Sequence, residues 1–178
     1  MNVIRILAVS GSLRAASSNT QLLQAAMRLA PANIEVRLYD GLSRLPHFNP
    51  DLDGEAAPPE VLDLRRRIAE AHGVLICSPE YARGVPGSLK NALDWLVSCS
   101  EFPDKPVALF NASQRSTHAQ ESLRLTLQTM SARLIDSACT TIPLLGTKLD
   151  ASGIAADPTF GPQVRTALVR FAEAITSS

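Results

Sequence analysis

Short apolar segments alternate along the chain with longer segments whose apolar residues recur every three or four positions. The short segments are typical of buried strands and the longer ones of amphipathic helices. The expected strands are Val3–Val9, Ile34–Tyr39, Gly73–Cys77, Pro106–Asn111 and Ile135–Ile142. The expected helices are Thr20–Leu29, Glu60–Ala71, Ser88–Ser98, Ala119–Leu134 and Gln163–Ile175, with Ser88 as an N-cap after Pro86 and Gly87.

This alternation predicts an α/β fold, a sandwich in which helices cover both faces of a five-stranded, mostly parallel sheet. Ligands of such a sheet bind outside the carboxyl ends of the strands, where the strand order reverses. We therefore expect the chemistry in the loops after the first, third and fourth strands. The long segment 40–59 is rich in Pro, Gly, Asp and Asn. A loop of that length is usually functional or covered by a partner.

The length of 178 residues predicts one domain, residues 1–178, and 46% hydrophobic with 19% charged residues is ordinary for a globular protein. Lys+Arg and Asp+Glu both total 17, which argues against a nucleic-acid partner and against a strongly acidic electron carrier. The apolar N-terminal run breaks at Ser10 and Gly11, so we expect no signal peptide, no membrane span and a cytoplasmic location.

Three cysteines, Cys77, Cys99 and Cys139, lie far apart and show no metal-ligand spacing. They are expected to be reduced thiols packed in the core, and no metal site is expected.

The loop after the first strand, residues 11–20, contains three Ser, one Thr, one Asn and one Arg, and no acid. It leads into a helix N-terminus, where free N–H groups favour an anion. A phosphate cradle is the prediction, and a Ser-rich helix cap with a solvated Arg14 is the alternative. This loop has no Gly-Lys-Ser/Thr, no Gly-x-Gly-x-x-Gly and no Cys with an Arg five residues on, which argues against a triphosphatase, a dinucleotide site and a thiolate phosphatase.

The loop after the third strand, residues 78–87, holds two Pro, two Gly and Tyr81. Such a shaped backbone suits the flat isoalloxazine ring of a flavin, which needs main-chain donors at its polar edge. A tight turn with a half-buried Tyr81 is the alternative interpretation.

The segments GSLRAASSN and SPEYARGVPGSLKNALDW resemble two motifs of the NADPH-dependent FMN reductase family, which includes bacterial quinone, chromate and azo-dye reductases. The resemblance extends from about Val3 to Asp136. It implies a flavodoxin-like fold, a three-layer sandwich with strand order 2-1-3-4-5. It also implies a bound FMN whose phosphate is held by Ser12, Arg14, Ser17, Asn19 and Thr20 and whose ring is lined by Pro79, Glu80, Tyr81 and Ala82, mostly through the backbone. The full set of expected FMN-binding residues is Gly11, Ser12, Leu13, Arg14, Ser17, Ser18, Asn19, Thr20, Pro79, Glu80, Tyr81, Ala82, Gly84 and Ser113.

The chain departs from this family at two places. Ala82 stands where family members commonly have Asn, which removes a side-chain contact and leaves the main-chain ones. In the loop after the fourth strand, Thr117 and His118 replace a Gly-rich stretch, and Ser113 alone keeps its place. These side chains are expected to narrow the site or weaken FMN affinity. His118 is a weak candidate for proton donor to a reduced quinone, and a solvated helix-start histidine is the alternative.

No Ser/His/Asp or paired-carboxylate constellation stands out, as expected where a flavin performs the redox chemistry. We expect NADPH or NADH to deliver hydride to flavin N5, and quinones, free flavin or similar small acceptors to take the electrons in the same place. Arg83 and Arg115 are candidates for attracting the phosphates of the nicotinamide cofactor. The alternatives are a flavodoxin-type electron carrier, a flavin-supplying reductase that holds FMN weakly, and a phosphate-binding regulatory module without flavin.

Helix Ser88–Ser98 is apolar around most of its circumference, which one sheet face cannot bury. The resemblance points to a homodimer packed on this helix, or a homotetramer. A deep core helix is the alternative.

Overall fold

The computed structural model describes residues 3–177, apart from the side chain of Glu55. Its sheet is parallel throughout, in the order β2-β1-β3-β4-β5, and a further short strand, β6, also pairs with β4. This is the strand order that the resemblance implied. The strands are β1 Ile4–Ser10, β2 Ile34–Leu38, β3 Gly73–Cys77, β4 Pro106–Asn111, β5 Arg133–Leu134 and β6 Thr140–Thr141.

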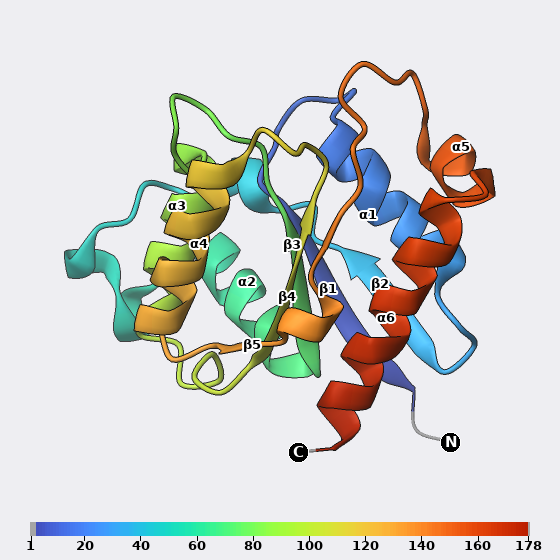
Figure 1. Cartoon of the computed structure of the whole chain (residues 1–178). Helices are drawn as coiled ribbons and strands as arrows, with labels where there is room; N and C mark the ends of the chain where they lie inside the picture. The colour runs from blue at the N-terminus through green and yellow to red at the C-terminus, as the bar shows by residue number, and fades with distance from the viewer. Residues whose placement is uncertain (1–2, 178) are drawn as a thin grey trace.

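Helices cover both faces of the sheet, with α1, α5 and α6 on one face and α2, α3 and α4 on the other (Figure 1). The expected three-layer α/β sandwich of flavodoxin type is therefore confirmed. The helices are α1 Ser18–Leu29, α2 Pro59–Glu70, α3 Gly87–Leu96, α4 Thr117–Thr129, α5 Ala151–Ala156 and α6 Phe160–Thr176.

The side chains on the two faces of β1 pack into two separate hydrophobic cores. Ile6 and Ala8 pack with the α1 and α6 side chains, whereas Leu7 and Val9 pack with those of α2 and α3. Successive side chains of a strand point to opposite faces of the sheet. A strand whose two faces are both covered therefore has an unbroken apolar sequence. This is why the central strands were recognisable from their sequence.

The expected fifth strand, Ile135–Ile142, is wrong in its extent. Its place beside β4 is taken by β5 and β6, with a 3-10 turn at Asp136–Ala138 between them. Asp and Ser favour turns because their side chains compete for local backbone groups. The strand is therefore interrupted at residues that the apolar pattern had counted as part of it.

Several helices also differ from the expectation. The helix expected to reach Leu134 ends at Thr129, and Ser131 then adopts a positive φ of 59°. Ser88 lies inside the first turn of α3, whose N-cap is Pro86. Helix α5, which packs against α1, was not expected at all. The helix expected over Gln163–Ile175 begins earlier, at Phe160, where Asp157 accepts hydrogen bonds from the backbone of Thr159 and Phe160.

The segment between β2 and α2 folds over the outer side of α3 and forms three short 3-10 turns, Leu42–Arg44, Pro50–Leu52 and Gly54–Ala56. Trp95 of α3 is fully buried beneath it, and its indole nitrogen donates to the carbonyl of Pro46 at 2.8 Å. Phe48 packs edge-on against the same indole, with ring centroids 5.0 Å apart. The chain's own segment therefore covers Trp95, whereas Leu89, Leu93 and Leu96 of α3 pack in the core beneath the sheet, so both account for apolar surface that had suggested a partner.

An ion pair fastens the same segment to the helical layer. Arg65 of α2 donates to Asp53 at 2.6 Å and also to the carbonyl of Trp95. The hydrogen bond from Arg65, aided by Ser98, lowers the pKa of Asp53 to about 2. A carboxyl whose pKa falls on folding stabilises the fold above its unfolded pKa, and this contribution is lost as the pH falls toward the folded pKa.

We therefore expect wild-type protein to lose part of its stability between about pH 4 and pH 2 through Asp53. Asp53→Asn removes this titration, so it should be the less stable protein at pH 6 and should lose less stability on acidification. Urea unfolding at each pH measures the difference. Asp51→Asn, at an exposed position of the same segment, is the control. Parallel pH profiles of wild type and Asp53→Asn would contradict the assignment.

Candidate functional site

Strands β1, β3 and β4 end at Ser10, Cys77 and Asn111, and each is followed by one of the three loops that the sequence singled out. Because the strands are parallel and adjacent, these loops emerge at the same edge of the sheet. Gly11 joins the first two loops: its N–H donates to the carbonyl of Cys77 at 2.9 Å. A Cβ on Gly11 would lie 2.4 Å from the Ser78 hydroxyl, so this close approach requires glycine.

The first loop is organised by hydroxyl groups. Ser10 and Thr20 share a hydrogen bond of 2.8 Å between their hydroxyls, and the Ser12 hydroxyl accepts from the Arg14 N–H at 3.3 Å. The side chains of Ser12, Arg14 and Thr20 line a cavity of about 230 Å³ together with the end of β2. The structure thus brings together three of the five residues expected to hold a phosphate.

The N-terminus of α1 faces this loop with its backbone donors free of a side-chain cap. Ser17 is the N-cap residue and is buried, yet its hydroxyl makes no capping hydrogen bond, and the first turn of α1 contains no acid. Uncapped N–H groups and the positive end of the helix dipole form an anion site. This arrangement fits a phosphate better than a closed helix cap.

The Asn19 side chain makes a contact that the sequence analysis did not predict. Its side-chain oxygen accepts a hydrogen bond from the Cys77 thiol at 3.2 Å, within the core. Burial raises the pKa of the Cys77 thiol, so the sulfur keeps the proton that it donates. The Asn19 amide oxygen therefore links α1 to β3. Of the remaining expected residues in this loop, Leu13 and Ser18 are exposed.

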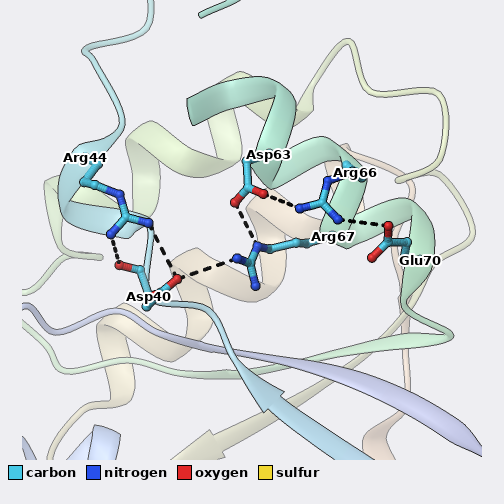
Figure 2. A network of polar contacts seen from close by, with 6 residues as sticks. All are labelled: Asp40, Arg44, Asp63, Arg66, Arg67 and Glu70. Carbon is cyan, nitrogen blue, oxygen red and sulfur yellow. Dashed lines mark hydrogen bonds and ion pairs between the residues drawn. The ribbon is translucent and has the colours of Figure 1, made fainter. Parts of the chain in front are cut away.

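The cavity also contains residues that the sequence argument missed, because they follow β2 and not β1. Tyr39 and Asp40 also line it. Burial, with the Asp63 carboxylate nearby, raises the pKa of Tyr39 to about 12, so its hydroxyl stays protonated. A carboxylate beside a phosphate is unfavourable, but Asp40 lies 3.6 Å from a guanidinium nitrogen of Arg44 and 3.9 Å from one of Arg67 (Figure 2). These two guanidinium groups offset its charge.

The second loop forms a tight turn at residues 81–84. Tyr81 and Gly84 exchange two backbone hydrogen bonds, of 3.1 and 2.9 Å. The central residues, Ala82 and Arg83, both have positive φ, 48° and 61°. Positive φ at both positions is typical of a type I′ turn, for which Asn-Gly is the preferred sequence. Ala82 and Arg83 therefore leave this turn strained, and the Asn that the family resemblance implied at position 82 would suit its backbone better.

We expect the double substitution Ala82→Asn with Arg83→Gly to stabilise the protein by about 1–2 kcal/mol, because Asn and Gly adopt positive φ at lower cost. Thermal unfolding measures the gain. Ala56→Asn with Arg44→Gly, outside this turn, is the control pair and should not raise the melting temperature. An unchanged or lower melting temperature of the turn variant would show that the turn is not strained.

Glu80 connects the second loop to the third. Its carboxylate accepts from the backbone N–H of Ala119 at 2.9 Å, in the first turn of α4. Pro79, Glu80 and Gly84 are half-buried, whereas Tyr81 and Ala82 are exposed. The Glu80 side chain is thus engaged with α4, and the expected backbone contacts of this loop with a flavin ring stay a prediction.

The third loop is shorter than the sequence suggested, because Thr117 and His118 already belong to α4. Ser113 is half-buried, and its hydroxyl accepts from the Arg115 N–H at 3.2 Å, so it shapes the loop. His118, Arg83 and Arg115 are exposed. The structure gives none of these three a contact that would mark a catalytic role.

Among residues 3–177, no helix is long and apolar enough to cross a membrane. Within the same part of the chain, no group of three or more His, Cys, Asp or Glu residues is placed to hold a metal ion.

A parallel sheet of order 2-1-3-4-5 with helices on both faces defines the flavodoxin-like class, in which ligands bind at the edge where these loops lie. The family model for NADPH-dependent FMN reductase matches residues 4–144. The chain belongs to this family. The resemblance noted in the two loop motifs is thereby confirmed.

Individual relatives agree with this assignment. An NAD(P)H-dependent FMN reductase of Pseudomonas aeruginosa is 39% identical over 129 residues, which are 70% of this chain and 69% of the relative. A quinone reductase of Escherichia coli is 37% identical over 106 residues, which are 59% of this chain and 55% of the relative. The structure of FerB, a flavoenzyme NAD(P)H:(acceptor) oxidoreductase from Paracoccus denitrificans, aligns over 98% of both chains with a TM-score of 0.81 and 28% identity. These names favour an oxidoreductase over a flavodoxin-type carrier.

Proposed function

We propose that this protein is an FMN-dependent NAD(P)H oxidoreductase that passes electrons to quinones, free flavin or similar small acceptors. The observation that carries the proposal is the uncapped N-terminus of α1 beside the hydroxyl groups of Ser12 and Thr20. The names of the relatives and the family assignment support the flavin and the reaction class.

The residues present fit the phosphate of FMN. The first-turn N–H groups of α1, the hydroxyls of Ser12 and Thr20 and the guanidinium of Arg14 are donors without a competing acid in the same loop. The backbone of residues 79–84 would line the ring, held in place by the turn at Ala82 and by the Glu80 bond to α4.

FMN, when bound, supplies the two-electron chemistry between the nicotinamide and the acceptor. The protein's part is to bind and orient the cofactor and to exclude water from the site. The first loop would hold the phosphate end of FMN, and the backbone of the second loop would contact its ring. The exposed guanidinium groups of Arg83 and Arg115 attract the phosphates of NADPH or NADH. His118 remains a weak candidate for proton transfer.

Steady-state assays test this proposal. Protein incubated with FMN and freed of excess flavin should oxidise NADPH or NADH several-fold faster when 1,4-benzoquinone is added. A protein that binds FMN but oxidises neither nucleotide would be an electron carrier. A protein that reduces FMN only when the flavin is supplied as a free substrate would be a flavin-supplying reductase.

The oligomeric state and location are part of the same proposal. We propose a homodimer or homotetramer packed on α3, and a cytoplasmic location. The segment 46–57 already covers Trp95, so an interface would use the parts of α3 that this segment leaves exposed, such as Lys90 and Gly87. Light scattering after size-exclusion chromatography measures the mass, and a monomer at all concentrations would contradict the proposed assembly.

A further inference from the structure

A cavity of about 280 Å³ lies over β1, between α2 and β2, and we call it the arginine groove. It exists because α2 packs on β1 and β3 but not on β2, the last strand of the sheet. β2 buries Ile34 and Val36 on the α1 face, so Glu35 and Arg37 point to the α2 face. No helix of the described chain covers them there, and this part of the sheet is open to a ligand.

The arginine groove is lined by four guanidinium groups and one carboxylate. These groups are Arg5 of β1, Arg37 of β2, and Arg66, Arg67 and Glu70 of α2. Arginines that come from several elements to one cavity suit a phosphate, because the planar N–H forks match its oxygen atoms. The excess of positive charge among the lining residues therefore indicates an anionic ligand.

Carboxylates outside the groove pair with three of these arginines. Arg37 pairs with Glu35 at 2.8 Å, and Asp63 accepts from both Arg66 and Arg67 (Figure 2). The side chains of Arg37 and Arg66 are 66% and 56% exposed. Exposed ion pairs contribute little free energy, so these two guanidinium groups can turn to an acceptor of higher charge.

Arg5 differs from the other three, because it pairs with no carboxylate of residues 3–177. Its Nε donates to the backbone carbonyl of Glu70 at 3.0 Å, and a terminal nitrogen lies 3.4 Å from Nε2 of His72. The Nδ1 atom of His72 accepts from the backbone N–H of Arg5 at 2.9 Å, so the proton of the neutral ring is on Nε2. Burial, with the charges of Arg5 and Lys105 nearby, lowers the pKa of His72 and keeps this ring neutral.

Two N–H donors therefore face each other at Arg5 and His72 and form no hydrogen bond. An oxygen atom that accepts from both would replace this unfavourable approach with two hydrogen bonds. This observation is independent of the charges that line the groove. It points to the same kind of ligand, an anion with several oxygen acceptors.

We propose that the arginine groove binds a pyrophosphate group, either free or carried by a larger molecule. Its two linked phosphoryl groups offer enough charge and enough oxygen acceptors to engage guanidinium groups from β1, β2 and α2 together. A volume of about 280 Å³ admits such a group but is small for a whole nucleotide. The groove shares no lining residue with the cavity in which we place the FMN phosphate, so the proposal does not depend on the flavin.

Isothermal titration calorimetry of the FMN-saturated protein with sodium pyrophosphate, at low ionic strength, tests the proposal. Bound FMN keeps the phosphate site of the first loop filled. Ser12→Asp without FMN is the second titration, because its carboxylate repels anions from that loop. The test therefore works even if the wild type does not retain FMN. Both proteins should bind one pyrophosphate per chain, and orthophosphate at least about tenfold more weakly.

Variants of the groove should change this affinity in opposite directions. Arg5→Gln and Arg37→Gln should each weaken binding at least about tenfold, because each removes a charged hydrogen-bond donor. Glu70→Gln should tighten binding several-fold, because it removes the carboxylate that lines the groove. Arg165→Gln removes the same charge from an exposed position of α6, on the other face of the sheet, and should bind like wild type.

Heat that never saturates, an unchanged affinity of Arg37→Gln, or equal weakening by Arg165→Gln would overturn the proposal. Binding that is absent both from the FMN-saturated protein and from Ser12→Asp would overturn it as well. Circular dichroism of each variant shows whether it folds. Arg37 is exposed, so its variant gives the result if Arg5→Gln, which loses its bond to α2, does not fold.

ADP in place of pyrophosphate distinguishes the two sources of the group. Tighter binding of ADP than of pyrophosphate would assign the groove to the diphosphate of a nucleotide, and weaker binding would assign it to free pyrophosphate. Binding of neither compound would overturn the proposal. Because the titration measures no redox reaction, its outcome is separate from that of the reductase assay.

Discussion

Ser12→Asp is expected to weaken FMN binding by at least about 100-fold. Ser12 is buried, and its hydroxyl lines the cavity at the N-terminus of α1 in which we place the phosphate. A carboxylate about 4 Å from a phosphate charge costs about 4 kcal/mol at the effective dielectric constant of a protein surface, and a loss of about 3 kcal/mol already corresponds to roughly 100-fold. Quenching of FMN fluorescence during titration measures the dissociation constant.

Ser12→Asn separates charge from shape in this experiment. Asn is nearly isosteric with Asp and neutral, so it should weaken binding much less than Asp does. Ser122→Asp, on the exposed side of α4, adds the same charge outside the cavity and should leave the dissociation constant near that of wild type. If Asp and Asn at position 12 weaken binding equally, the phosphate does not lie beside Ser12.

Trp95→Ala is expected to destabilise the protein by about 3–5 kcal/mol, the cost of removing a large buried aromatic side chain. Trp95 is fully buried, bonds the Pro46 carbonyl through its indole nitrogen, and contacts the Phe48 ring. The loss should release the segment 46–57 first, because this segment rests on the indole. Urea unfolding followed by circular dichroism measures the free energy, and limited proteolysis should cut within residues 46–57.

Trp95→Phe is the graded control for this prediction. It keeps an aromatic ring under the segment but loses the hydrogen bond to Pro46, so it should cost less than Ala and leave the segment more resistant to protease. Leu125→Ala, at an exposed position of α4, should change the stability little. A Trp95→Ala protein as stable as wild type, or one cut first elsewhere, would show that Trp95 does not hold the segment.

The parts of the fold that the sequence predicted are those in which local pattern and tertiary burial agree. Gly73–Cys77 is apolar throughout because it is covered on both faces, and the structure places it at the centre of the sheet with all five residues buried. Ile135–Ile142 shows a similar apolar pattern, yet it is broken at Asp136–Ala138. At the edge of the sheet, turn-forming side chains outweigh the apolar pattern.

The end of α4 illustrates a different limit. In a sequence, the end of a helix is usually marked by Gly or Pro. Neither residue occurs in the positions just after Thr129. The helix stops because Ser131 takes a positive φ, with its carbonyl accepting from the N–H of Asp104 at 2.8 Å. This contact joins residues far apart in the sequence, so a local pattern does not contain it.

The sequence predicted the part of the candidate site that lies within a single loop. Ser12, Arg14 and Thr20 gather around one cavity as expected, because all three lie in one loop between a strand and a helix. Tyr39 and Asp40 were missed because they follow β2. They reach the cavity only through the pairing of β1 with β2, which the local sequence pattern does not reveal. The pairing of Asn19 with Cys77 has the same origin.

The absorbance spectrum of the protein mixed with FMN, followed by anaerobic addition of NADPH and then NADH, tests the central claim most directly. The account predicts flavin bands that stay with the protein through gel filtration and bleach with at least one of the two nucleotides. A protein that remains colourless after incubation with FMN, or whose bound flavin stays oxidised with both nucleotides, would contradict it.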